Sequence, residues 1–132
     1  MKNWLEMNQR ELGKWGEGKA KEYLMGKGYR ILQENYKCKS GEIDLIGSHG
    51  GYLVFIEVKT RRSTSYGLPV EAVDHRKQQK YIKTALNYIK EKRMLNTNYR
   101  FDIVEVRIGR DGSTSINHIV NAFQAVNSGY YL

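Results

Sequence analysis

The sequence has one cysteine and one proline in 132 residues, and it contains no long apolar run. A lone thiol, Cys38, cannot form an internal disulfide, and it fits a reducing cytoplasm. No stretch reaches the roughly 20 apolar residues that a transmembrane helix needs. Residues 1–6 have no apolar run behind their lysine, so no secretory signal is expected. We therefore predict a cytoplasmic protein without membrane association, with residues 1–132 forming a single domain.

Positive charge is in excess in this sequence. The chain has 22 Lys and Arg against 14 Asp and Glu, a formal net charge of +8. Such a balance favours polyanionic partners, and nucleic acid is the first of these. The basic residues that we expect to contact phosphates lie in two short stretches of the sequence, 61–62 and 76–80. They are Arg61, Arg62, Arg76, Lys77 and Lys80. Contacts of this kind position a nucleic acid but carry no sequence code.

Apolar periodicity and turn residues predict two helices and five strands in the order αβββαββ. This order is typical of an α/β fold with a mixed central sheet flanked by helices, in which one strand–helix–strand unit makes a parallel crossover. Residues 121–132 receive no assignment. The predicted helices are 8–27 and 69–92, and the predicted strands are 29–38, 42–48, 52–60, 100–108 and 115–120.

Gly50-Gly51 predicts the turn of a β-hairpin, because both central positions of a type I′ turn need positive φ. With the turn there, residues whose numbers sum to 101 lie opposite each other. Asp44 then faces Glu57, and Glu42 faces Lys59. The same register places Ile43 and Leu45 together on one face. A loop longer or shorter by two residues would leave Asp44 and Glu57 on one face but diagonal, and a one-residue bulge would move these two acids to opposite faces.

Two carboxylates directly opposite on paired strands repel, so a sheet gains nothing from Asp44 and Glu57 by themselves. A hard divalent cation such as Mg²⁺ would remove this repulsion, since it takes carboxylate oxygens as ligands. Lys59 could then polarise water or stabilise negative charge. The alternative is an ordinary ion pair between Glu57 and Lys59, with Asp44 solvated, and such pairs contribute only about 0–1 kcal/mol.

Other polar residues have both a functional and a structural interpretation. Glu17 lies at the edge of the apolar face of the first helix, where a surface glutamate needs no special role. Lys77 and Gln78 fall inside the apolar stripe of the second helix, so they either extend outward or point into a cleft. The histidines lack zinc-ligand spacing, and we expect all three, at positions 49, 75 and 118, to lie on the surface.

Several blocks together resemble the YraN-like family. The most specific are Gly41–Ile46 (GEIDLI) and Phe55–Arg61 (FIEVKTR), and the likeness continues through Arg100–Val104 and Asn121–Phe123. That family is similar in turn to the restriction-endonuclease-like superfamily, and to archaeal Holliday-junction resolvases in particular. The resemblance covers nearly the whole chain.

The resemblance implies a restriction-endonuclease-like fold and a site for Mg²⁺ or Mn²⁺. The D…ExK motif of the superfamily falls on Asp44, Glu57 and Lys59, with Val58 lending a backbone carbonyl and Glu17 matching a helix acid of the resolvases. Gln78 resembles, loosely, a polar helix residue near some nuclease sites. The implied activity is structure-selective cleavage of branched or flapped DNA, by a homodimer if the substrate has two-fold symmetry. The alternative is a nucleic-acid-binding or ribosome-associated module that keeps the fold without catalysis.

Overall fold

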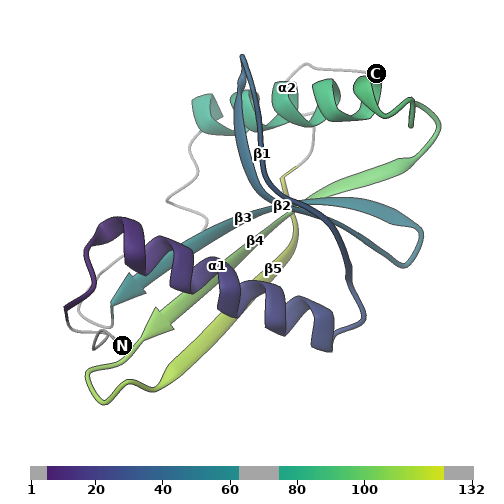
Figure 1. Ribbon diagram of the computed structural model, residues 1–132. Helices are drawn as coiled ribbons and strands as arrows, with labels where there is room; N and C mark the ends of the chain where they lie inside the picture. The colour runs from purple at the N-terminus through teal and green to yellow at the C-terminus, as the bar shows by residue number, and fades with distance from the viewer. Residues whose placement is uncertain (1–5, 63–74, 124–132) are drawn as a thin grey trace.

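The computed structural model describes residues 6–62 and 75–123 (Figure 1). Its elements follow the predicted order αβββαββ. The predicted start of the second helix at Pro69, and the loop before it, lie outside the described residues. The elements are α1 (Gln9–Gly26), β1 (Arg30–Cys38), β2 (Gly41–His49), β3 (Tyr52–Arg62), α2 (His75–Glu91), β4 (Asn98–Ile108) and β5 (Thr114–Phe123).

The strands form one open sheet in the order β1-β2-β3-β4-β5. β3 and β4 are parallel, and the other neighbouring pairs are antiparallel. The parallel pair is joined through α2, as a parallel connection requires a crossover. The predicted mixed sheet with one parallel crossover is therefore confirmed. β5 continues to Phe123, so the prediction ended this strand three residues too early.

The hairpin between β2 and β3 has the predicted turn and register. Gly50 and Gly51 have φ of 56° and 83°, which is the region that favours glycine. The ladder runs from His49 opposite Tyr52 to Leu45 opposite Ile56, so each pair of residue numbers sums to 101. The turn chemistry therefore fixed the register on which the candidate site depends.

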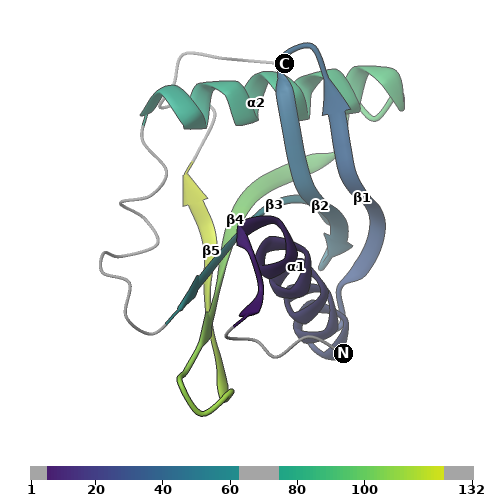
Figure 2. The same ribbon diagram turned by 60° about the vertical axis from the view of Figure 1, so that its left-hand side comes forward.

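The two helices cover opposite faces of the sheet (Figure 1, Figure 2). Alternate residues of β3 show this division, because successive side chains of a strand point to opposite faces. Ile56 packs with Leu24 of α1, whereas Phe55 packs with Ile82 of α2. All four side chains are fully buried. Each face thus has its own apolar cluster, and Glu57 falls on the α2 side together with Phe55.

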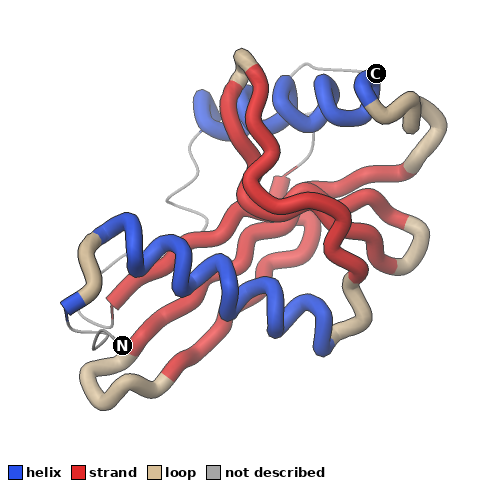
Figure 3. The backbone as a smooth tube through the Cα atoms, in the orientation of Figure 1, coloured by secondary structure: helices blue, strands red, loops and turns tan. Residues whose placement is uncertain are grey.

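The β1–β2 hairpin bends out of the sheet, and its distal end crosses α2 (Figure 3). Tyr36 and Ile43, on the distal part of this hairpin, belong to the α2 cluster, whereas Leu45 belongs to the α1 cluster. The prediction that Ile43 and Leu45 share a face is therefore wrong. A straight strand would have placed them together, whereas the bent hairpin divides them between the two clusters.

Local features position α1. Asn8 caps the helix by accepting from the Glu11 N–H at 2.8 Å, and the Glu11 carboxylate accepts from the Asn8 N–H at 3.2 Å. This capping box satisfies two N–H groups at the helix start. Farther along, Gly16 is buried against the Thr60 side chain of β3. The close approach brings the next residue, Glu17, toward the bent hairpin.

Candidate functional site

The candidate site lies where β2 separates from β3. Their ladder ends at Leu45 and Ile56, one residue before Asp44 and Glu57 would be opposite each other. Beyond this point the Asp44 carboxylate accepts a hydrogen bond from the Val58 N–H at 2.8 Å. A side chain thus bonds a backbone donor of β3 at the place where the neighbouring strand leaves. The two acids lie beside this gap.

The backbone carbonyl of Val58 also points toward this gap. A strand residue directs its N–H and its carbonyl toward the same neighbouring strand. Since the Val58 N–H points to Asp44, the Val58 carbonyl is directed to the same side. Carboxylate and carbonyl oxygens of Asp44, Glu57 and Val58 therefore come from two strands that diverge at one point.

Glu57 is buried in an unusual way for a carboxylate. Its side chain is 6% exposed, and its Oε1 lies 2.9 Å from Lys59 Nζ and 3.6 Å from Lys77 Nζ. Within the part of the chain that the structure describes, Glu57 Oε2 is buried without a hydrogen-bond partner. A buried carboxylate oxygen left unpaired costs free energy, typically about 1–3 kcal/mol or more for a charged group. The atom is a candidate ligand for a cation.

The environment of Asp44 is strongly unfavourable to its negative charge. Burial raises the pKa of Asp44 to about 7, with further contributions from the charges of Glu57, Glu17 and Glu42. The hydrogen bond from Val58 acts in the opposite direction and only partly offsets the rise. A cation beside this carboxylate would reverse the balance and favour its charged form.

Lys59 and Lys77 share the other oxygen of Glu57. Burial opposes the charged form of Lys59, but its contacts with Lys77 and Glu57 outweigh this effect and raise its pKa. For Lys77, the contact with Lys59 and partial burial lower the pKa. The ion pair of the alternative interpretation is therefore present, while Asp44 is partly buried and bonded to the Val58 N–H rather than fully solvated.

A cavity of about 220 Å³ adjoins both acids, between the bent hairpin and α2. Sequence reasoning missed three of its lining residues: Tyr81 fits the apolar stripe of the helix, Gly41 entered only as part of the GEIDLI block, and nothing in the sequence singled out Thr84. Burial raises the pKa of Tyr81 well above its ordinary value, as do the charges of Asp44 and Glu57. Tyr81 therefore keeps its hydroxyl proton and can donate toward the site.

Glu17 approaches the site from α1. Burial raises its pKa, the charge of Glu42 adds to the rise, and a hydrogen bond with Asn35 partly offsets it. The register of the β1–β2 ladder places Asn35 opposite Asp44, and Asn35 has φ of 52°. The helix acid thus lies beside the same bend, although it lines a neighbouring cleft rather than the cavity next to Glu57.

The predicted pair of Glu42 with Lys59 is wrong. Because β2 leaves β3 after Leu45, Glu42 instead lies opposite Lys37 on β1, with Glu42 Oε2 3.8 Å from Lys37 Nζ. Both side chains of this pair are exposed.

The basic residues predicted to bind phosphates have different surroundings. Lys77 and Lys80 line the cavity next to the acids. Arg61 lies 3.5 Å from the buried carboxylate of Glu105, on the same face of the sheet as Glu57. Arg62 Nη2 donates to the carbonyl of Met7 at 2.6 Å, which ties it to the start of α1. Among the other two, Arg76 is exposed at the start of α2, and Gln78 is partly buried and does not line this cavity.

The donor set fits a divalent ion of the kind that binds oxygen. Within residues 6–62 and 75–123, no three His, Cys, Asp or Glu side chains group closely enough to form a metal site by themselves. Asp44 and Glu57 nevertheless line one cavity, and the Val58 N–H bonds Asp44 beside it. Mg²⁺ is often held by one or two carboxylates, with water and substrate oxygens completing its shell.

Comparison with known proteins shows the family to which the chain belongs. The model of a family described as "Uncharacterised protein family UPF0102" matches residues 16–106. The chain is 48% identical over 120 residues to a UPF0102 protein of Caldanaerobacter subterraneus subsp. tengcongensis, covering 89% of this chain and 98% of that protein. It is 46% identical over 118 residues to a UPF0102 protein of Caldicellulosiruptor saccharolyticus, covering 89% and 100%. The chain belongs to the UPF0102 family, also called the YraN family.

The matched segment of this UPF0102 protein includes every acid of the candidate site, from Glu17 to Glu57. The resemblance on which the sequence analysis relied is thus confirmed at the level of the family. Among the described helices of the protein, none is long and apolar enough to span a membrane.

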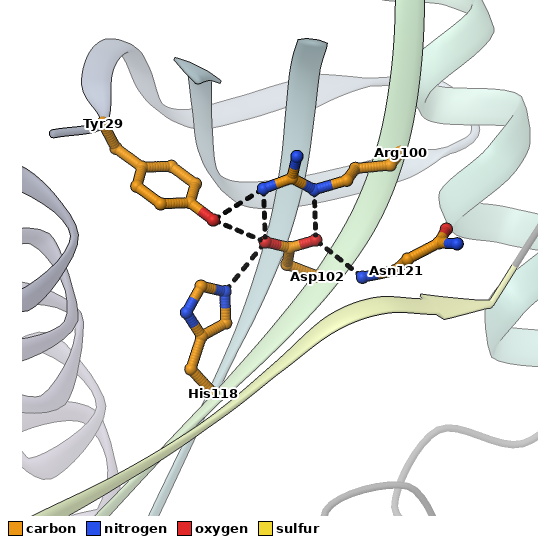
Figure 4. A network of polar contacts seen from close by, with 5 residues as sticks. All are labelled: Tyr29, Arg100, Asp102, His118 and Asn121. Atoms are coloured by element: carbon orange, nitrogen blue, oxygen red, sulfur yellow. Dashed lines mark hydrogen bonds and ion pairs between the residues drawn. The ribbon is translucent and has the colours of Figure 1, made fainter. Parts of the chain in front are cut away.

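A second polar cluster of the UPF0102 chain lies on the α1 side of the sheet (Figure 4). Asp102 is fully buried and binds Arg100 Nε at 3.0 Å, His118 Nε2 at 2.8 Å and the Asn121 N–H at 3.0 Å. The Tyr29 hydroxyl donates to Asp102 at 3.2 Å. The expectation that His118 is a surface residue is wrong, because this carboxylate satisfies its ring in the interior.

Proposed function

We propose that this UPF0102 protein is a metal-dependent endonuclease that hydrolyses DNA phosphodiesters and selects branched or flapped structures. The buried, unpaired Oε2 of Glu57 beside Asp44 is the observation that carries the proposal. Asp44 satisfies the Val58 N–H, and Glu57 pairs with Lys59 and Lys77 through Oε1. Oε2 of Glu57 has no such partner in the described structure, and an ion there would compensate it. The fold is consistent with a restriction-endonuclease-like domain.

The proposed ligands of Mg²⁺ or Mn²⁺ are Asp44, Glu57 and the Val58 carbonyl, with Glu17 organising the neighbouring shell. When bound, such an ion stabilises negative charge on phosphoryl oxygens and makes water a better nucleophile. Water adds to phosphorus, the bond to one ester oxygen breaks, and that oxygen leaves with a proton. Lys59, 2.9 Å from Glu57, orients the water or stabilises the charge that develops on the phosphate.

The proposed substrate is DNA because the cavity next to the acids also has the cations Lys77 and Lys80. Contacts to phosphates read backbone shape rather than base identity. A four-way junction offers two symmetric strands to cut, so for that substrate we propose a homodimer. The single thiol, Cys38, agrees with action in the reducing cytoplasm.

Cleavage of linear, flapped and four-way DNA during a titration of Mg²⁺ or Mn²⁺ tests the proposal. We expect metal-dependent cutting by the wild type, and a loss of at least a hundredfold in Glu57→Gln. Glu22→Gln is the matched control, because Glu22 is an exposed residue of α1 whose carboxylate lies 3.7 Å from Lys19 Nζ. Cutting should be unchanged in this control.

Two results of the cleavage assay would count against the proposal in different ways. Cutting that survives in Glu57→Gln points to a contaminant nuclease. Tight DNA binding without cutting at any metal concentration supports the non-catalytic module instead. Calorimetric titration of Mn²⁺ into the protein alone examines the ion site without activity, and Asp44→Asn should abolish the heat of binding.

A further inference from the structure

A second cleft lies next to the candidate site and has no role in the proposal above. It measures about 470 Å³ and opens between the first half of α1 and the middle of β1. Its volume is within the range of small-ligand sites, about 300–1,000 Å³. The lining residues are Gln9, Arg10, Gly13, Lys14, Glu17, Asn35 and Lys37.

The polar character of this cleft is mostly cationic. Arg10, Lys14 and Lys37 contribute three positive charges, and Glu17 contributes one acid whose raised pKa reflects burial and the nearby Glu42. Arg10 and Lys14 are exposed, and the structure gives neither an ion pair within salt-bridge distance in its described part. Gln9 and Asn35 add amide groups, which can donate to phosphate oxygens.

Lys37 has a carboxylate partner, but a weak one. Its Nζ lies 3.8 Å from Glu42 Oε2, and the two side chains are 72% and 58% exposed. Exposed pairs of this kind are held loosely, so Lys37 can turn to a stronger anion without a large loss.

Gly13 lines the cleft and adds no side chain to it. Arg10, Gly13, Lys14 and Glu17 recur at intervals of three or four residues, so they share one face of α1. A Cβ built on Gly13 meets no atom within 4 Å. A side chain at position 13 would therefore extend into the open space of the cleft.

The cleft adjoins the acids of the candidate site. Glu17 lines the cleft, and its charge contributes to the raised pKa of Asp44. Lys37 lines the cleft, while its partner Glu42 lines the cavity next to Glu57. Cations thus flank Asp44 from two directions, with those of the cleft on one side and Lys77 and Lys80 of α2 on the other.

We infer that the cleft between α1 and β1 binds a backbone phosphate of the nucleic acid, next to the phosphate that lies at Asp44 and Glu57. This inference rests on the proposed function for its ligand. The bound nucleic-acid strand would then extend from Asp44 and Glu57 along the face of α1 that carries Arg10 and Lys14. Binding of this phosphate holds the substrate in register and takes no part in bond breaking.

The chain offers a matched pair of variants that tests the inference. Gly13→Glu places bulk and negative charge in the cleft. Gly18→Glu makes the same change at an exposed position of the same helix, also with no atom within 4 Å of an added Cβ, and outside the cleft. Both variants have the same net charge, and both replace glycine with a residue that favours helix.

The measurement is fluorescence anisotropy of a labelled flapped duplex with metal-free protein at several salt concentrations. We expect Gly13→Glu to bind five- to tenfold more weakly than Gly18→Glu. For Gly13→Glu, the slope of log affinity against log salt concentration should be smaller in magnitude by about 1, which corresponds to one phosphate contact. Equal affinities and equal slopes for the two variants would overturn the inference, as would a wild type that does not bind the duplex.

A second comparison removes charge without filling the cleft. Arg10→Gln with Lys14→Gln should weaken binding more than Lys19→Gln with Lys27→Gln, which removes the same charge outside the cleft, from α1 and from its C-cap. Cleavage is measured in parallel. Loss of binding in the cleft variants supports the phosphate site even if no protein cuts DNA, so this outcome separates failure of the nuclease proposal from failure of the inference. Equal losses in the two double variants would contradict a specific site.

Discussion

Gly16 of α1 lies directly against the side chain of Thr60 on β3, so a Cβ at position 16 would overlap the threonine. The contact sets how closely the helix approaches the sheet, and the next residue along the helix is Glu17. Glycine in the middle of a helix is otherwise unfavourable, by about 1 kcal/mol relative to alanine. The close packing explains why the helix tolerates it here.

We predict that Gly16→Ala destabilises the fold although alanine is the better helix former. Overpacking of a buried contact costs about 1–3 kcal/mol. Gly18→Ala is the control, because its Cβ would meet open space, and it should be neutral or stabilise by up to about 1 kcal/mol. Urea unfolding monitored by circular dichroism measures both. Equal stabilities for the two variants would show that α1 can move away from Thr60 without cost.

A second prediction concerns Asp44 and pH. The folded-state pKa of about 7 lies above the ordinary value of 3.8, so the folded protein binds this proton more tightly than the unfolded chain. The free energy of unfolding should therefore fall as pH rises from about 4 to about 7, and then level off. Since one pKa unit corresponds to about 1.4 kcal/mol, the fall attributable to Asp44 amounts to about 2–4 kcal/mol.

Asp44→Asn should remove this dependence, because the amide does not ionise and its oxygen can still accept from Val58. The variant should be more stable than the wild type at pH 8 and similar to it at pH 4, measured by urea unfolding at both values. Mg²⁺ at pH 8 should narrow the difference, since an ion that binds only the folded wild type stabilises it. A wild type that is as stable as the variant at pH 8 would contradict the burial of this charge.

The sequence was sufficient to predict the hairpin but not its bend. Gly50 and Gly51 determine a type I′ turn, and from the turn the register to Leu45 and Ile56 follows by counting. Where the strands separate depends on tertiary packing, because Ile43 moves to the α2 cluster and no local signal marks that choice. That Asp44 and Glu57 line one cavity agrees with this register, whereas the hydrogen bond from Val58 to Asp44 was not predictable.

Buried polar residues were the other point at which sequence reasoning failed. His118 and Asp102 are far apart in the chain, and only the pairing of β4 with β5 brings them together. Tyr81 fits an apolar helical stripe equally well as a core residue or as a hydroxyl beside Glu57. Composition and periodicity describe which face a side chain is on, but they do not describe its hydrogen-bond partner.

The third prediction concerns Asp102. Burial opposes its charge, but hydrogen bonds from His118, Arg100 and the Asn121 N–H outweigh burial and lower its pKa. A lowered folded-state pKa contributes stability at pH values above the ordinary 3.8, and this contribution is lost as pH falls below about 4. Asp102→Asn leaves Arg100 without its buried partner, which costs about 3–5 kcal/mol.

The variant should therefore be much less stable than the wild type at pH 7, with a smaller difference near pH 3. Guanidinium unfolding at the two pH values measures this. Asp111→Asn, at a fully exposed turn, should change stability far less at either pH. The folded fraction of Asp102→Asn should still bind Mn²⁺, because the network lies on the α1 face, whereas Glu57 faces α2. Loss of the metal site in the folded variant would instead connect the two polar clusters.

The last prediction concerns the hydroxyl of Tyr81. The ring is buried in the α2 cluster, while its hydroxyl lies beside Glu57 and keeps its proton. Tyr81→Phe keeps the apolar packing and removes only the donor, so its free energy of unfolding should change by less than about 1.5 kcal/mol. If the hydroxyl helps to hold Glu57 in position for an ion, the variant should bind Mn²⁺ about tenfold more weakly.

Tyr88→Phe is the control on the same helix, because Tyr88 is buried against Phe55 and Tyr36 and does not line the cavity next to Glu57. Its affinity for Mn²⁺ should equal that of the wild type. Calorimetric titration compares the three proteins, and unfolding curves show whether both variants are folded at the temperature of the titration. An unchanged affinity in Tyr81→Phe would mean that Lys59 and Lys77 alone hold Glu57 in place, since they are its ion-pair partners in the described structure.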